Sequence, residues 1–163
     1  MAGDTWTALP DLPAGAEFRR VAARSATEIY AGSSGDGRLY QGDGSTWTAL
    51  GDAFEDDPAA ILATEDAVYL GLDEAEGSAL LRWDGVTLAE VPGGPPRISG
   101  LARLGDGLLV SGWDADRVAT VWRWDGATWS VDLDGESPPG VGAGGGLAYA
   151  LGDGTLWSAE GCE

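Results

Sequence analysis

The heptapeptide RWDGATW at residues 123–129 places a tryptophan directly after a glycine-containing turn. The same arrangement recurs at Trp47, and Trp6 is followed by the same three residues, Thr-Ala-Leu, as Trp47. Leu88 stands where the series lacks its tryptophan, so the four positions follow one another at about 41 residues. A fixed interval of this length is typical of repeat proteins, in which each repeat is one unit of supersecondary structure.

Each repeat contains four short segments with the composition of β-strands and little helical periodicity. The first is rich in Ala and branched residues, the second ends in Gly, and the fourth begins at the tryptophan position. Asp-Gly pairs at 43–44, 84–85 and 125–126 join the third segment to the fourth, and Asp-Gly is a strong hairpin signal. Four-stranded antiparallel units of about 40 residues are typical of β-propeller blades. Stacked solenoid repeats of this length mostly contain helices, and a β-sandwich does not require the period.

We therefore predict an all-β protein, a four-bladed β-propeller in which each blade is a four-stranded antiparallel meander. One domain spans residues 1–163, with blades at 18–50, 58–91, 98–132 and 140–161, the last completed by residues 4–9. The N-terminal strand at 4–9 closes the last blade and covers two otherwise exposed strand edges. The small Ala, Gly and Val residues of the first strands suit a narrow central channel. The alternative is a pair of chains that exchange these ends and form eight blades.

The charge of the chain is strongly negative. It has 27 acidic residues against nine arginines, with no lysine and no histidine, for a net charge of -18. Such a chain repels phosphate groups and anionic lipids, so we expect neither nucleic acid binding nor membrane insertion. We also expect no signal peptide, because residues 1–6 have no basic and apolar start, and the location stays unknown. Cys162 is the only cysteine, which excludes an intrachain disulfide.

Two stretches carry a resemblance to a known class of repeat. Residues 82–85 and 123–129 resemble the repeats of bacterial β-propellers with an aromatic-Asp-Gly-Ser/Thr-Thr-Trp pattern. The resemblance extends over the whole chain and implies a fold rather than an activity. The Trp-Asp pairs are also similar to those of WD40 repeats, although the Gly-His element is absent. The Asp-box of sialidases has a different spacing, so the resemblance implies no sialidase residues here.

We predict that the protein is not an enzyme and has no catalytic residues and no cofactor. Without histidine or lysine, general acid–base chemistry would depend on carboxylates or tyrosine. The carboxylate pairs at 56–57, 73–74 and 114–116 lie in expected surface turns. We also predict no metal site, because the acidic groups at 114–116 and 132–136 do not complete an EF-hand loop.

Two sets of residues are candidates for specific roles. Trp113, Asp114 and Arg117 form a candidate ligand-binding group, since sugars stack on aromatic faces beside acidic or basic partners. This group does not repeat along the chain. Trp6, Trp47 and Trp129 do repeat, and we expect them to pack between blades.

The predicted function is a non-enzymatic module for protein–protein interaction or structural support. The loops at 55–58, 92–96 and 137–140 differ more between repeats than the strands do, and their prolines stiffen one face for a partner. That partner is a protein or a larger assembly, for example a virion or tail on which the module is displayed. The alternative is a lectin-like carbohydrate-binding module for adhesion, with a glycan as ligand.

Overall fold

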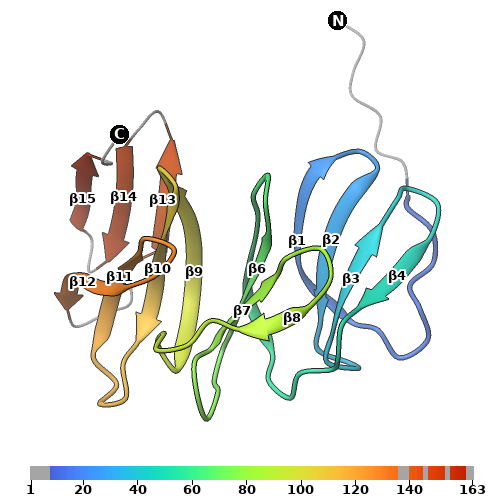
Figure 1. Ribbon diagram of the computed structural model, residues 1–163, viewed down its shortest axis with the longest axis horizontal. Coiled ribbons are helices and arrows are strands. Elements are labelled where there is room, and N and C mark those ends of the chain that lie inside the picture. Colours follow the sequence, from blue (N-terminus) through green and yellow to red (C-terminus); the bar gives the residue numbers. More distant parts are fainter. Residues whose placement is uncertain (1–7, 136–139, 145–146, 153–154, 161–163) are drawn as a thin grey trace, which may run out of the picture.

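The computed structural model describes residues 8–135, 140–144, 147–152 and 155–160. All regular structure in these residues is β-strand, in four separate antiparallel sheets that we call blades A to D (Figure 1). Blade A contains β1 (Phe18–Ser25), β2 (Glu28–Ser33), β3 (Arg38–Gly42) and β4 (Trp47–Leu50). Blade B contains β5 (Pro58–Ala63), β6 (Val68–Leu72), β7 (Leu80–Trp83) and β8 (Leu88–Glu90). Blade C contains β9 (Arg97–Leu104), β10 (Gly107–Trp113), β11 (Ala119–Trp124) and β12 (Trp129–Gly135). Blade D contains β13 (Gly140–Gly144), β14 (Leu147–Gly152) and β15 (Thr155–Glu160).

The Asp-Gly pairs form the predicted hairpin turns. In blade C the amide of Asp125 donates to the carbonyl of Thr128, with an N–O distance of 3.2 Å, and Gly126 has a φ of 99°. The Asp125 carboxylate accepts the amides of Ala127 and Thr128 at 2.8 and 2.7 Å. These hydrogen bonds hold the pKa of Asp125 below its ordinary value. Asp43 and Asp84 make equivalent turns, so this prediction is confirmed in all three complete repeats.

The blades follow one another as an arc. The first strands β1, β5, β9 and β13 pack in that order along its inner side, and blades A and D lie at its two ends (Figure 1). Packing of β13 against β1, which would close a ring, is not found in the part of the chain that the structure describes. The predicted four-stranded meander is thus present in blades A to C, and the described blades form an open array.

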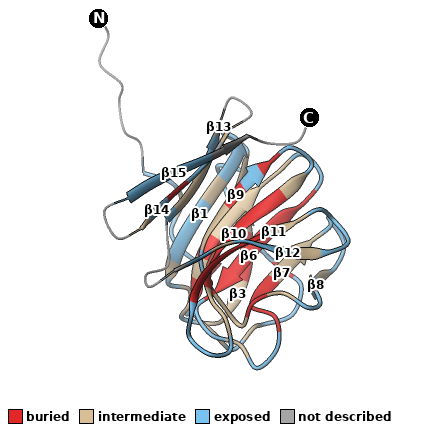
Figure 2. Cartoon of the chain, turned by 90° about the vertical axis from the view of Figure 1, so that its left-hand side faces the viewer, coloured by how far each residue is buried: buried red, intermediate tan, exposed pale blue. Residues whose placement is uncertain are grey.

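The core consists of apolar clusters between neighbouring blades. Blades B and C share the largest, which includes Leu70, Leu80 and Ile98, all fully buried. Smaller clusters join blade A to blade B and blade C to blade D. Figure 2 shows the same distribution, with buried residues concentrated in β6 and β10 and exposed residues along β1, β14 and β15. Each blade is therefore stabilised mainly by its neighbours.

The predicted strand at residues 4–9 lies mostly outside the described residues. Ala8 and Leu9 are described and do not belong to a strand. Within its described residues, blade D has three strands. The part of the chain that the structure describes contains no helix long and apolar enough to cross a membrane.

Candidate functional site

Because successive strands are antiparallel, every second connection along the chain lies at the same end of the blades. The loops between second and third strands, and those that lead from one blade to the next, lie at this end, which we call the loop face. Its described loops are residues 34–37, 51–57, 73–79, 91–96 and 114–118. The divergent, proline-containing loops at 55–58 and 92–96 and the candidate group at Trp113 all belong to it, while residues 137–139 lie outside the described residues.

A groove of about 360 Å³ opens on the loop face where β1, β5 and β9 begin. Because these are the first strands of successive blades, residues from three blades converge there. The lining residues are Arg19, Arg20, Asp57, Pro58, Ala59, Asp73, Ile98, Ser99 and Trp113.

Two arginines of β1 line the groove together with two aspartates, Asp57 and Asp73. The Nε of Arg20 donates to the carbonyl of Ala59 on β5 and so links blades A and B. The Nε of Arg19 donates to Ser34 Oγ at 2.9 Å, and 55% of the Arg19 side chain is exposed. Of the nine arginines in the chain, three lie on β1 and two on β9. Sequence reasoning missed this groove, and the Arg-Arg pair in a strand otherwise rich in small residues was the available signal.

The three candidate binding residues take different positions. Trp113, at the end of β10, is half-buried and lines the groove. The Asp114 carboxylate accepts the amides of Asp116 and Val118 at 2.9 and 2.7 Å, so it shapes the loop that follows. Arg117 lies in that loop with a φ of 64° and does not line the groove.

Acidic side chains surround the same end of the molecule. Burial raises the pKa of Asp56, and the negative charges of Glu55, Glu74, Asp57 and Glu76 raise it further. Glu74 also accepts the Arg97 guanidinium, with an N–O distance of 2.6 Å. The rim of the groove therefore has a negative potential next to the two arginines.

The remaining hydrogen-bonded acids at the loop face have structural partners. The Asp36 carboxylate accepts the hydroxyls of Ser33 at 2.6 Å and of Tyr40, and Ser33 Oγ accepts the Glu17 amide at 3.0 Å. This network fastens the β2–β3 turn to the start of β1. Among the described residues, no group of three His, Cys, Asp or Glu side chains is arranged to hold a metal ion.

The recurring tryptophans differ in their contacts. Trp129 donates its indole N–H to the carbonyl of Pro92 at 3.1 Å and packs near Trp124, with ring centroids 6.2 Å apart. Trp124 in turn meets Tyr69 of blade B edge-on at 5.8 Å. Trp47 packs edge-on against Phe18 of its own blade at 4.7 Å, and its buried indole nitrogen has no hydrogen-bond partner among the described residues. Trp6 lies outside the described residues.

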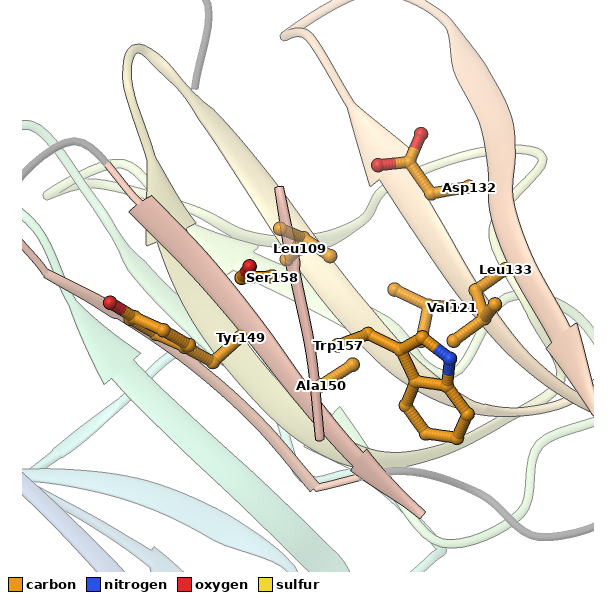
Figure 3. A pocket seen from close by; sticks show the side chains of 8 residues that line it. All are labelled: Leu109, Val121, Asp132, Leu133, Tyr149, Ala150, Trp157 and Ser158. Carbon is orange, nitrogen blue, oxygen red and sulfur yellow. The ribbon is translucent and has the colours of Figure 1, made fainter. Parts of the chain in front are cut away.

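Two further grooves lie between blades. One of about 230 Å³ lies between blades C and D, where Figure 3 shows the Trp157 indole beside Val121 and Leu133. Its walls also include Leu109, Asp132, Tyr149, Ala150 and Ser158, and they are mainly apolar. Another of about 480 Å³ lies between blades B and C, next to the hairpin turns at Asp84 and Gly126.

Comparison with known proteins identifies the fold. No family model and no curated protein matches the chain. Among solved structures, the chain resembles the computationally designed Ika4 protein, with a TM-score of 0.70, 18% identity, and coverage of 97% of this chain and 98% of that one. It resembles the RRP9 WD40 repeats with a TM-score of 0.63 and 14% identity, over 89% of this chain and 48% of that chain. It also resembles YCF48, solved bound to D1 peptide, with a TM-score of 0.52 and 16% identity, over 90% of this chain and 56% of that chain. The chain thus spans about half the length of the natural proteins in this comparison, and it has a β-propeller-type fold.

Proposed function

We propose that the protein is a non-enzymatic interaction scaffold that binds a protein partner through the loop-face groove. The observation that carries this proposal is the convergence of Trp113, Arg19 and Arg20 in one groove across three blades. An aromatic side chain and arginines are the residue types most enriched at the energetic centres of protein interfaces. The variable loops around the groove would supply specificity.

The chemistry of the groove favours an extended peptide segment of the partner. Guanidinium groups bind backbone carbonyls and carboxylates, and the acidic rim around Asp56 attracts basic side chains. The similarity to YCF48, which was solved with a bound peptide, supports a peptide ligand. The similarity to WD40 repeats supports a scaffold role.

The accompanying fold proposal is a single β-propeller domain over residues 1–163. Blades A to C correspond to residues 18–50, 58–91 and 98–132, and residues 4–9 supply the outer strand of a blade at 140–161, either in the same chain or in a second copy. In this arrangement Trp6, Trp47 and Trp129 pack between blades. A virion or tail assembly is one setting in which such a scaffold would be displayed.

Site-specific photo-crosslinking tests the proposed function. We would place p-benzoylphenylalanine at Trp113, and for comparison at Val86, a hairpin residue at the opposite end of the blades with 83% exposure. In cells that produce the protein, we expect a discrete protein adduct from position 113 and none from position 86. Arg20→Ala should reduce the adduct at least tenfold while the chain stays folded.

The same positions distinguish protein binding from the alternative function, carbohydrate binding. Binding to a glycan array that is lost in Trp113→Ala, without a protein adduct, would support the carbohydrate-binding module instead. Equal adducts from positions 113 and 86 would contradict the proposed groove.

A further inference from the structure

Blade D presents apolar side chains at positions that are buried in every other blade. An apolar residue near the start of the third strand is almost completely buried in blades A, B and C. The residues are Leu39, Leu80 and Val121, with exposed fractions of 0%, 0% and 1%. Each belongs to the cluster shared with the next blade. Leu156 has the same position in blade D and is 64% exposed, and its partner in the ladder, Leu151, is 56% exposed. The outer face of blade D therefore has the side chains of a blade junction without a neighbouring blade in the described residues.

Among the described residues, no strand pairs with the outer edge of β15, whereas each of the other blades has a fourth strand there. In blade C, Trp129 lies opposite Trp124 and Ser130 lies opposite Arg123. Trp157 pairs with Ala150 as Trp122 pairs with Val110, which aligns the two ladders. In this register Trp6 and Thr7 correspond to Trp129 and Ser130, so Thr7 falls opposite Ser158. A tryptophan at this position would face the groove between blades C and D that Figure 3 shows.

The buried indole nitrogen of Trp47 indicates the same missing contact from the side of blade A. Trp129 donates to Pro92, which follows the outer strand of the preceding blade. The corresponding acceptor for Trp47 is the carbonyl of Pro10, which directly follows residues 4–9 in the sequence. A buried donor without a partner is unfavourable, so docking of residues 4–9 ahead of blade A would remove this penalty.

The shape of the arc indicates whether blade A of the same chain or blade A of a second copy can reach the outer face of blade D. Within one chain, blades A and D lie at opposite ends of the arc (Figure 1). The four blades superpose on 48% of the chain of the RRP9 WD40 repeats, so their curvature matches part of a longer propeller. Two copies related by a two-fold axis make two identical D–A junctions and leave no free edge.

We propose that two copies of this chain join blade D to blade A at both junctions and form an eight-bladed ring. Residues 4–9 of each copy form the outer strand of the partner copy's blade D. Leu151 and Leu156 pack against blade A of the partner copy, and the indole of Trp47 donates to the carbonyl of Pro10. The second copy covers the apolar face that a single chain leaves exposed.

Light scattering coupled to size-exclusion chromatography measures the assembly of the full chain. We expect a dimer, and Leu156→Glu should raise its dissociation constant at least tenfold. The isolated chain should tolerate this change because the Leu156 side chain is largely exposed within one copy. Val86→Glu adds the same charge at a more exposed hairpin position and should leave the dimer intact.

Cysteine pairing identifies which copy supplies residues 4–9. In a Cys162→Ser background, Thr7→Cys and Ser158→Cys are placed on separate chains that are co-expressed. We expect a disulfide-linked pair on a non-reducing gel, and no product when Thr7→Cys is combined with Arg82→Cys, which already faces β8. A monomer by light scattering would overturn the proposal. It would also be overturned if the separate chains gave no linked pair while a chain carrying both Thr7→Cys and Ser158→Cys formed the disulfide within itself. Neither result depends on partner binding at the loop-face groove, so the two proposals fail separately.

Discussion

Trp129 and Trp47 occupy the same position of two repeats and have different surroundings. Trp129 lies at the junction of blades B and C, where its indole has an acceptor and its ring adjoins Trp124. Trp47 lies in blade A, which has no preceding blade among the described residues, and its indole nitrogen is buried without an acceptor. The same residue in the same register is therefore satisfied only where a neighbouring blade is present. The junction, rather than the blade, is the stabilising unit of this fold.

The largest effect should come from breaking the B–C junction. Trp124→Ala removes the ring between Tyr69 and Trp129, and we expect a loss of about 3 kcal/mol in the free energy of unfolding. Urea denaturation followed by circular dichroism measures it. Val86→Ala, at a hairpin turn away from any junction, should stay within about 0.5 kcal/mol of the wild type. A similar loss in both variants would contradict the importance of the junction.

Each of the two tryptophan rings lies close to a glycine, so alanine at these glycines tests how firmly each ring is held. A Cβ at Gly94 would lie 2.8 Å from the Trp129 ring and 2.4 Å from Ser78 Oγ, whereas one at Gly42 would lie 2.7 Å from the Trp47 ring. In the monomeric Leu156→Glu background, we expect Gly94→Ala to reduce the free energy of unfolding by about 2 kcal/mol and Gly42→Ala by about 1 kcal/mol. The difference arises because the Pro92 carbonyl holds Trp129 in place, while the Trp47 indole has no such bond. Thermal and urea unfolding of both variants, side by side, compares the two; a larger loss in Gly42→Ala would show that Trp47 is the more firmly held.

Replacement of each indole by phenyl sharpens the comparison further. Trp129→Phe removes the hydrogen bond to Pro92 and should lower the free energy of unfolding by about 1 kcal/mol. In the monomeric Leu156→Glu background, Trp47→Phe should have almost no such penalty, because no hydrogen bond is lost. In the assembled protein the Trp47→Phe penalty should approach that of Trp129→Phe. Equal penalties in both backgrounds would show that Trp47 has an acceptor within one chain.

The smallest effect concerns the hairpin turns, which are alike in blades A, B and C. Backbone amides of Thr128, Ser45 and Thr87 hold the pKa values of Asp125, Asp43 and Asp84 below the ordinary value of about 4. A carboxylate whose pKa is lower in the folded than in the unfolded state stabilises the protein at pH values above its unfolded-state pKa. This stabilisation is lost as the pH falls through the folded-state pKa. The urea midpoint should therefore decrease as the pH falls below about 4. The triple Asp→Ala variant should show a shallower decrease, and an unchanged slope would mean that these carboxylates do not contribute.

Much of the fold could be predicted because repetition is visible in one sequence. The Asp-Gly turns, the four-strand pattern and the blade order follow from local chemistry and spacing, and the structure contains them. The groove at Arg19, Arg20 and Trp113 could not be predicted. Its residues come from three blades, and their proximity depends on how β1, β5 and β9 pack. Trp113 alone was recognised in advance, since an aromatic residue outside the repeat stands out.

By itself the sequence determined the period, the turns and the apolar pattern, because hairpins and alternation depend on neighbouring residues. Only the tertiary structure decided which of the equivalent positions are buried. Leu80 and Leu156 have the same place in their repeats, yet the first is fully buried and the second is 64% exposed. The physical reason is that burial depends on the adjacent blade, and the angle between blades, which sets the curvature of the arc, is a property of packed side chains far apart in the sequence.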